Sequence, residues 1–284
     1  MKIRFQIILT LLLAAVMVLL YALPSKTEER IYRLPVLLYH HFAETATEST
    51  VVSPTRFREQ MTALKEAGYT TVTLGQVADF VEHGVPLPEK AVLITMDDGY
   101  TSNLTIAAPI LEELGMCATV FVIGIYEGEE ISPHSGNPLY PARFAYEDAQ
   151  RWVENGVLEL QSHTYDMHQQ VKDGWSGRGG ILPLAGEGQA EYRTALLDDA
   201  RAFAEKRAEH GIDTPLIALA YPYGFFSGES EEALREAGFQ ITFTTRERMN
   251  LLRIGDTTCL WNMGRFNVTD RDSGEALLCR LGEI

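Results

Sequence analysis

The chain has few cysteines and no cluster of basic residues. Its three cysteines, Cys117, Cys259 and Cys279, allow at most one disulfide and require none, which excludes a disulfide-stabilised scaffold. Lysine and arginine are outnumbered by acidic residues, giving a formal net charge of −15. A phosphate-binding surface needs clustered Lys and Arg, so nucleic acid is excluded as a partner. The charge permits an amine-bearing partner, although an acidic surface that keeps the protein soluble is the simpler explanation.

One long hydrophobic run is present, at the N-terminus. Lys2 and Arg4 precede the apolar stretch Phe5–Leu23, which ends at Pro24 and a charged run. About 20 apolar residues suffice to cross a bilayer, and no small-x-small cleavage pattern follows. We therefore expect residues 1–30 to be an uncleaved anchor with a short linker, and the basic N-terminus predicts that the rest of the chain lies outside the membrane. A cleaved signal peptide is the alternative.

The remaining residues, 31–284, fit one large domain, near the usual size of about 250 residues for a barrel of alternating strands and helices. Apolar runs alternate there with amphipathic stretches, which is typical of a mainly parallel sheet covered by helices. Strands are expected over 34–39, 69–74, 91–95, 117–123, 157–161, 216–220 and 239–244. Helices are expected over 54–68, 76–82, 106–114, 146–154, 191–209 and 229–236. The irregular stretches 124–141 and 172–188 are expected to shape a binding cleft.

Polar motifs follow three of the expected strands. Asp97-Asp98-Gly99 comes after the first, His163 and His168 after the second, and a Tyr-Pro-Tyr-Gly segment after the third. Loops beyond the strand ends of such a barrel meet at one face. One carboxylate and two neutral imidazoles form a three-ligand set for Zn²⁺ or a similar ion, with a position left open. Asp-Asp-Gly alone is a common turn. The metal site is predicted because all three motifs follow the ends of strands.

These motifs resemble those of a known family. Thr95–Gly99, Ser162–Thr164 with His168, and Ala220–Gly224 are similar to the motifs of the polysaccharide deacetylases, the family 4 carbohydrate esterases or NodB-homology domains. The resemblance covers most of the chain after residue 33, in the family's order. It implies a distorted β/α barrel with fewer than eight strands. It also implies metal-dependent removal of N-acetyl or O-acetyl groups from glycans.

The resemblance also implies a role for each motif residue. Asp98, His163 and His168 hold the metal, which we expect to be Zn²⁺, with Co²⁺ or Ni²⁺ as other ions that suit these ligands. Asp97 is the general base. The backbone N–H of Tyr223 stabilises the charge that develops on the carbonyl oxygen, and loss of one such donor costs roughly 3 kcal/mol of barrier.

Two departures from the family's commonest pattern narrow the expectation. Four residues separate His163 from His168, where three are usual. The longer interval resembles the branch that deacetylates poly-β-1,6-N-acetylglucosamine, a biofilm-matrix polymer. Ala220 stands where most members have an arginine that orients the base. Arg265 is the candidate replacement, since a guanidinium beside Asp97 would fix its rotamer and keep it ionised.

The general acid is also expected at a different position in the sequence from the family's usual one. The last forty residues hold no histidine, where the family usually has this acid. In the poly-N-acetylglucosamine branch a Tyr-His element near the N-terminus supplies it, and here Tyr39 precedes His40 and His41. His40 is the expected donor of a proton to the leaving amine. His41 points to the other side if the strand continues through it.

Three functions are compatible with these observations. The expected one is an extracytoplasmic metal-dependent hydrolase that removes N-acetyl groups from a β-linked N-acetylglucosamine polymer. The same site could act on peptidoglycan, on chitin oligomers or on O-acetyl esters. A non-catalytic glycan-binding protein is the alternative of another class, and the complete set Asp97, Asp98, His163 and His168 disfavours it.

Overall fold

The computed structural model describes residues 31–173 and 175–282. The chain divides into two units, Met1–Ile31 and Tyr32–Ile284, and the description below concerns the second. The predicted leader therefore lies outside the described residues. Within the described ranges, no helix is both long enough and apolar enough to cross a membrane.

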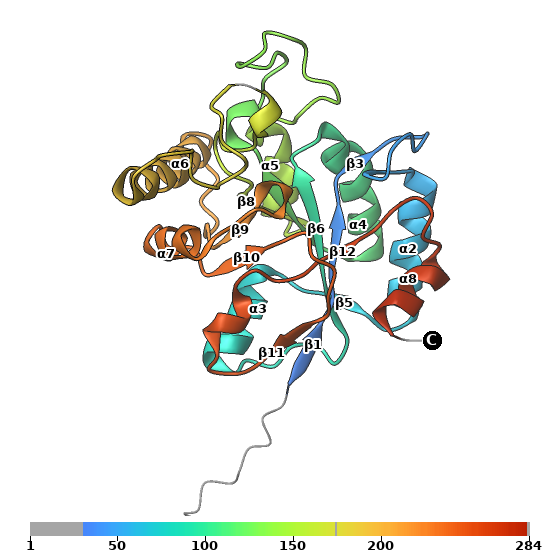
Figure 1. Ribbon diagram of the computed structural model, residues 1–284. Coiled ribbons are helices and arrows are strands. Elements are labelled where there is room, and N and C mark those ends of the chain that lie inside the picture. The colour runs from blue at the N-terminus through green and yellow to red at the C-terminus, as the bar shows by residue number, and fades with distance from the viewer. Residues whose placement is uncertain (1–30, 174, 283–284) are drawn as a thin grey trace, which may run out of the picture. The chain divides into compact units, whose positions relative to one another are not determined.

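A parallel sheet forms the centre of this unit. Its strands follow the order β10-β9-β8-β7-β6-β2-β12, and each neighbouring pair is parallel (Figure 1). A short strand, β5 (Thr70–Thr71), also pairs with β6. The main strands are β2 (Val36–Tyr39), β6 (Ala91–Asp98), β7 (Ala118–Val122), β8 (Leu158–Ser162), β9 (Ala218–Ala220), β10 (Ile241–Phe243) and β12 (Phe266–Asn267).

The two edges of the sheet approach each other through Met263, which lies just before β12. Its N–H donates to the carbonyl of Thr242 at 2.8 Å, and its carbonyl accepts from the N–H of Thr244 at 2.9 Å. The segment that leads into β12 thus pairs with β10, while β12 itself pairs with β2. The parallel sheet therefore curls into a half-barrel whose two edges are bridged at this one point, and the predicted α/β class is confirmed.

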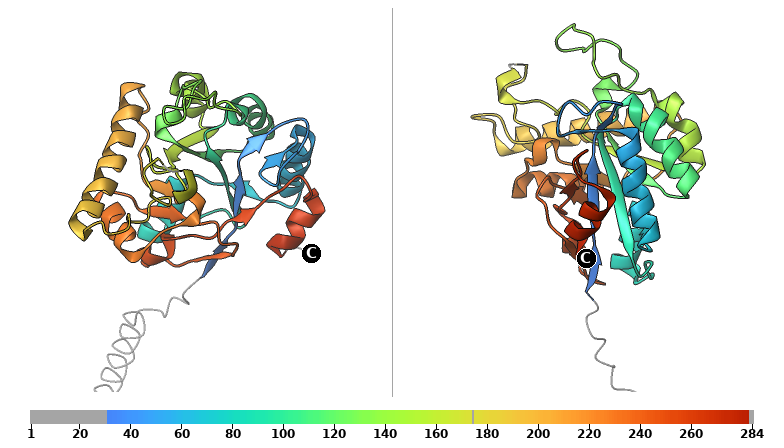
Figure 2. Two further views of the ribbon diagram at one scale, coloured as in Figure 1. Left: turned by 45° about the horizontal axis from the view of Figure 1, so that its top comes forward. Right: turned by 90° about the vertical axis from the view of Figure 1, so that its right-hand side faces the viewer.

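Helices cover the outside of the sheet (Figure 2). The pair α6 and α7 lies on one side, and the pair α2 and α8 lies on another. The helices are α2 (Pro54–Glu66), α3 (Leu74–His83), α4 (Ala108–Leu114), α5 (Tyr146–Glu154), α6 (Gln189–Glu209), α7 (Gly228–Glu236) and α8 (Gly274–Leu281). A π-helical turn, Asn103–Ala107, precedes α4, and its last two residues were expected to be ordinary helix.

The helix starts show why these segments are helical. Ser53 caps α2 by accepting from the N–H of Arg56, and Pro54 occupies the first helical position, as the sequence predicted. Thr73 and Gln76 form a capping box that starts α3 at Leu74. The expected strand over 69–74 is therefore wrong beyond its two paired residues, because its end is the cap and first turn of a helix.

β6 is longer than predicted. All eight of its residues are buried, which is typical of a strand covered on both faces. The prediction ended this strand at Thr95 because two charged residues follow, yet Asp97 and Asp98 pair in register with Phe121 and Val122 of β7. The aspartates are therefore the last residues of the strand, not the first of a loop.

The two ends of the half-barrel differ. The carboxyl ends of the strands carry the long loops over 124–141 and 172–188, seen at the top of Figure 1. The antiparallel pair of β1 (Tyr32–Leu34) and β11 (Asn250–Leu252) lies at the opposite end. A further short pair, β3 (His41–Phe42) and β4 (Val51–Val52), follows β2. Side chains that extend from the carboxyl ends of separate strands can therefore meet at one rim.

Candidate metal centre

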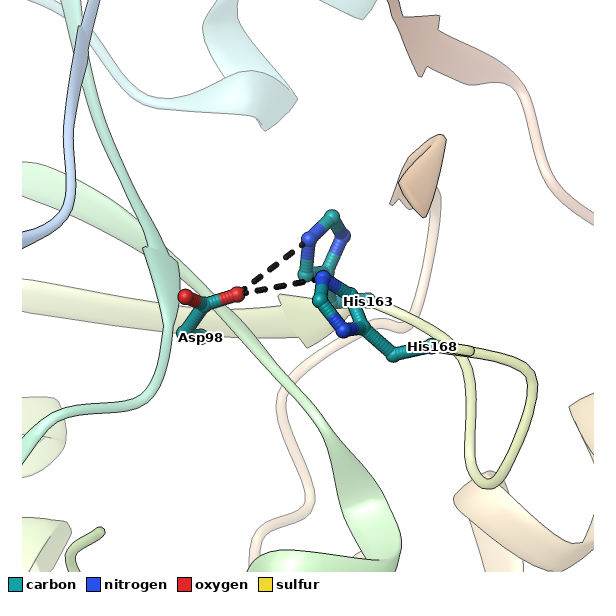
Figure 3. A group of neighbouring side chains, drawn as sticks. All are labelled: Asp98, His163 and His168. Carbon is teal, nitrogen blue, oxygen red and sulfur yellow. Dashed lines mark ion pairs between the residues drawn. The ribbon is translucent and has the colours of Figure 1, made fainter. Parts of the chain in front are cut away.

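Three possible ligands meet at this rim (Figure 3). Oδ1 of Asp98 lies 3.5 Å from Nε2 of His163 and 3.4 Å from Nε2 of His168. The three donor atoms all lie within 4.8 Å of one another. Tetrahedral zinc bonds of about 2.1 Å place neighbouring donors about 3.4 Å apart. The donor set therefore fits a single divalent ion held by one carboxylate and two imidazoles.

The ring of His163 is oriented for this purpose by the chain itself. Its Nδ1–H donates to the backbone carbonyl of Ala220, at 2.8 Å, so its Nε2 carries the lone pair. A hydrogen bond of this kind fixes the tautomer and orientation of a metal-ligating imidazole. Ala220, where an arginine was expected from the family, thus contributes through its main chain at the end of β9.

The second imidazole packs against the Tyr-Pro-Tyr-Gly turn. The ring of Tyr223 lies 4.6 Å from the ring of His168, and its hydroxyl is 3.2 Å from Nδ1 of that histidine. Burial lowers the pKa of His168 to about 4, although Asp98 opposes this. The imidazole is therefore neutral at pH 7, which is the form that binds a metal. Tyr223 was predicted to matter through its backbone, and its side chain also contacts the site.

Asp97 is held by Arg265. The guanidinium contacts both carboxylate oxygens, with Nη1 2.7 Å from Oδ1 and Nη2 2.8 Å from Oδ2. Burial raises the pKa of Asp97, but Arg265, together with His163, outweighs burial and holds that pKa below its usual value. Oδ2 of Asp97 lies 3.9 Å from Nε2 of His163. An ionised carboxylate with a fixed rotamer therefore stands beside the three possible ligands.

Arg265 is itself completely buried, and its Nε donates to the carbonyl of Thr244 at 3.1 Å. Removing one partner of a buried ion pair leaves an uncompensated charge, which costs about 3–5 kcal/mol. We expect Arg265→Met to lower the free energy of unfolding by that amount, measured by urea denaturation. The double variant Arg265→Met/Asp97→Asn should recover much of the loss. An Arg265→Met cost below about 1 kcal/mol would contradict this account.

An exposed arginine provides the control for that prediction. Arg193 pairs with Glu236 at the surface, where both side chains are about half exposed. Exposed pairs contribute less than about 1 kcal/mol, so Arg193→Met should unfold almost as the unmodified chain does. A large effect at both positions would show that the loss of any arginine destabilises the chain, irrespective of burial.

The two N-terminal histidines have different surroundings. Burial lowers the pKa of His40, while the charges of Asp97 and Asp98 raise it, because His40 lies near the two carboxylates. Its Nδ1 is buried without a hydrogen-bond partner. Nδ1 of His41 lies 2.9 Å from Oγ of Ser102, in a strand pair outside the main sheet. His40, not His41, therefore joins the group at the rim.

Two nearby residues were not predicted. Burial raises the pKa of Tyr100, and the charge of Asp98 and a side-chain hydrogen bond with that carboxylate raise it further. The guanidinium of Arg143 lies 3.7 Å from the Tyr100 ring. Tyr100 directly follows the Asp-Asp-Gly motif and could have been noticed. Arg143 lies between a long loop and α5, where no pattern in the sequence marks it.

Backbone strain concentrates at this rim. Asp98, Thr164 and Tyr223 have φ values of 75°, 73° and 58°, in a region that non-glycine residues rarely adopt. Each such residue costs of order 1–3 kcal/mol and persists where the surroundings enforce it. At Gly224 a Cβ would lie 2.3 Å from Oγ1 of Thr245, so the turn that holds Tyr223 accepts only glycine there.

A second group of possible ligands, Glu127, Glu147 and His210, has a simpler explanation. Glu127 accepts from the N–H of Tyr146 at 2.6 Å and lies 3.2 Å from Nζ of Lys206. Its carboxylate therefore already has a cationic partner and an amide donor. The rim centre is the better metal site.

Known proteins are similar to this chain in sequence. The poly-beta-1,6-N-acetyl-D-glucosamine N-deacetylase of Escherichia coli (strain K12) is 27% identical over 223 residues, covering 72% of this chain and 33% of that protein. The enzyme of the same name from Staphylococcus epidermidis is 26% identical over 204 residues, covering 69% of this chain and 62% of that protein. The chain thus spans only a third of the first relative and less than two thirds of the second.

Solved structures agree on the architecture. IcaB from Ammonifex degensii superposes with a TM-score of 0.72 at 26% identity, covering 89% of this chain and 97% of that one. The de-N-acetylase from Aggregatibacter actinomycetemcomitans gives a TM-score of 0.74 at 21% identity, covering 88% of this chain and all of that one. The family model described as polysaccharide deacetylase matches residues 84–242, more than half of the sequence and the part that carries the aspartate pair and both rim histidines. The chain therefore belongs to the polysaccharide deacetylase family.

Proposed function

We propose that this chain is a metal-dependent N-deacetylase of β-linked N-acetylglucosamine polymers, with poly-β-1,6-N-acetylglucosamine as its substrate. The observation that carries the proposal is an ionised Asp97, fixed by Arg265, beside the ligand set of Asp98, His163 and His168. The names of the E. coli and S. epidermidis relatives support the substrate. The four-residue interval between the two histidines and the N-terminal position of His40 support the same choice.

The proposed reaction divides the work among residues already described. A divalent cation, Zn²⁺ by preference, would be held by Asp98, His163 and His168 and would supply Lewis acidity toward water and the acetyl carbonyl. Asp97 accepts the proton of the attacking water, since its carboxylate is ionised and oriented. Arg265 is a positioning residue, because it is completely buried and acts through its contact with Asp97. The backbone N–H of Tyr223 donates to the carbonyl oxygen as negative charge develops there.

His40 completes the proposed cycle as the acid that protonates the leaving amine. We expect His40→Ala to lower the rate of acetate release by about 10²-fold or more, the usual contribution of a general acid. His41→Ala serves as the matched control and should have a small effect, because that ring contacts Ser102. The two initial rates, measured at equal metal content, check this. The reverse ranking would assign the acid to His41.

Acetate release from defined substrates tests the function as a whole. The zinc-loaded chain is incubated with poly-β-1,6-N-acetylglucosamine oligomers, chitin oligomers, peptidoglycan fragments and an O-acetylated glycan, with Asp97→Asn as the blank. Release from the first substrate alone, or fastest from it, is the expected result. Faster release from another substrate would keep the chemistry and change the polymer. Release from none of them would favour a glycan-binding protein.

We also propose that the catalytic unit works outside the cytoplasmic membrane, attached through residues 1–30. The basic residues ahead of the apolar run and the absence of a cleavage pattern after it support this. Cell fractionation with an epitope tag at the C-terminus tests it. Recovery of the tagged chain with the cytosol would contradict the proposal.

A further inference from the structure

The segment that joins the two possible histidine ligands has no regular structure of its own. His163 directly follows β8, and the residues from there to His168 belong to no helix or strand. In a helix, backbone hydrogen bonding would fix the distance between two such side chains. Here the separation of the two imidazoles depends on whatever holds Thr164–Met167 in place.

Two amides of this segment are held locally. The N–H of Thr164 donates to Oγ of Ser162 at 3.0 Å, and the N–H of Met167 donates to Oγ1 of Thr164 at 3.1 Å. Such bonds shape a turn but do not attach it to the rest of the protein. The two amides between them, those of Tyr165 and Asp166, point to a different partner.

That partner is Asp199, in the middle of α6. Its Oδ2 accepts from the N–H of Tyr165 and its Oδ1 accepts from the N–H of Asp166, each at 2.8 Å. One carboxylate therefore accepts hydrogen bonds from two consecutive amides at the centre of the segment. The donors and the acceptor are separated by 33 and 34 positions in the sequence, so the contact attaches the ligand segment to a long helix.

The opposite side of the segment is fixed as well. The carbonyls of Thr164 and Tyr165 accept from the N–H groups of Gly124 and Ile125, at 3.0 and 2.8 Å. A Cβ at Gly124 would lie 2.7 Å from the ring of Tyr165, so the two chains approach too closely for a side chain. The segment therefore lies between the loop after β7 and Asp199, and it cannot move away from either without losing hydrogen bonds.

Asp199 is kept in this place at a cost to stability. Burial raises its pKa to about 6, even though the two amides lower it. A half-buried carboxylate whose hydrogen bonds do not fully offset its desolvation is a poor choice for stability alone. Residues that are unfavourable for stability are typically found at functional sites, where they hold other groups in position.

We propose that Asp199 is a positioning residue for the metal centre: by binding the amides of Tyr165 and Asp166 it sets the separation of His163 and His168. The inference rests on the proposed metal site. The contact also explains how the longer segment between the two histidines keeps one conformation. A longer irregular segment has more conformations, so it needs a hydrogen-bonded attachment to another part of the protein.

Metal affinity measures this role directly. We expect Asp199→Ala to weaken Co²⁺ binding by 10–100-fold, the usual effect of losing a residue that orients a ligand, and to alter the visible d–d spectrum of the bound ion. Asp198→Ala is the matched control. It removes the same charge from the preceding position of α6, where Asp198 is exposed and pairs with Arg201 on the same helix. Cobalt titration of the full chain, followed by absorbance, gives both quantities.

A second measurement avoids any loss of folding in the variant. In the metal-free chain without substitution, the amides of Tyr165 and Asp166 should exchange slowly with deuterium, and in Asp199→Asn they should exchange faster, since an amide side chain offers one acceptor where the carboxylate offers two. Fast exchange in the unsubstituted chain would overturn the inference.

The outcomes separate the two proposals. If the unsubstituted chain binds Co²⁺ and Asp199→Ala binds it equally well with an unchanged spectrum, Asp199 has no positioning role and the proposed function stands. If both Asp199→Ala and Asp198→Ala weaken binding alike, the effect is one of net charge, and the inference fails. If the unsubstituted chain binds no Co²⁺, the metal centre itself is wrong.

Discussion

Asp97→Asn is expected to abolish acetate release while the chain keeps its metal. The substitution preserves the shape of the side chain but removes the carboxylate that accepts a proton from water, and a general base contributes about 10²–10⁴-fold to the rate. The proposed ligands Asp98, His163 and His168 should remain in place, because none of them depends on Asp97 for a hydrogen bond shorter than 3.5 Å. Acetate release and metal content by elemental analysis, measured on one preparation, check this.

The neighbouring aspartate provides the comparison for this prediction. Asp98→Asn should lose metal and activity together, since Oδ1 of Asp98 faces both imidazoles. If instead Asp97→Asn loses the metal and Asp98→Asn retains it, the two roles are exchanged. Stability must be recorded for both variants, because Asp97→Asn leaves the buried Arg265 without its charged partner.

His163→Ala is expected to remove metal and activity at the same time. The ring is almost fully buried, its Nδ1 is fixed by the carbonyl of Ala220, and its Nε2 faces Asp98. Losing a ligand from a three-ligand set should cost more than the 10–100-fold in affinity that follows the loss of a supporting contact. Competition with a coloured zinc chelator gives the affinity, and acetate release is followed over the same range of zinc concentration.

An exposed histidine serves as the control. His83 lies at the end of α3 with about two thirds of its side chain exposed, so His83→Ala should bind zinc as the unmodified chain does. Activity in His163→Ala that excess zinc fully restores would mean that His163 contributes affinity alone. Activity with no metal bound would remove the cation from the proposed reaction.

Much of the central sheet could be predicted because its strands are buried on both faces. Such strands need continuous apolar runs, and these are visible in the sequence. The prediction of β6 stopped short because Asp97 and Asp98 interrupt its apolar pattern, whereas their backbone groups still pair with β7. Side-chain character ended the pattern before the hydrogen-bonded strand ended. Charged residues at the buried end of a strand are unfavourable for stability, so a pair of them at this position is typical of a functional site.

The later part of the chain was harder to predict. β11 and β12 have three and two residues, too few for any periodicity to appear, and α8 was not expected at all. Arg265 lies in this region and reaches Asp97 across 168 positions of sequence. Arg265 was nevertheless named from the sequence as the candidate partner of the base, and the folded chain shows its guanidinium in contact with both carboxylate oxygens of Asp97.

Contacts between distant polar groups account for what was missed. Asp199 lies on a helix face that the hydrophobic pattern treats as ordinary, and its partners are main-chain amides that no sequence motif records. Arg143 is recognised only by its contact with Tyr100. A pattern along the sequence reports which residues are apolar or polar, but it does not report which polar groups meet after folding.

The pairing of Met263 with β10 has a consequence for when activity can appear. The family match ends at residue 242, whereas the partner of Asp97 arrives only with the segment that closes the sheet. A nascent or clipped chain that ends before Arg265 would carry the base and every ligand, yet its base would be unrestrained. The restraint on Asp97 therefore arrives with the segment that joins the two edges of the sheet, and a chain that ends before Arg265 is expected to lack it.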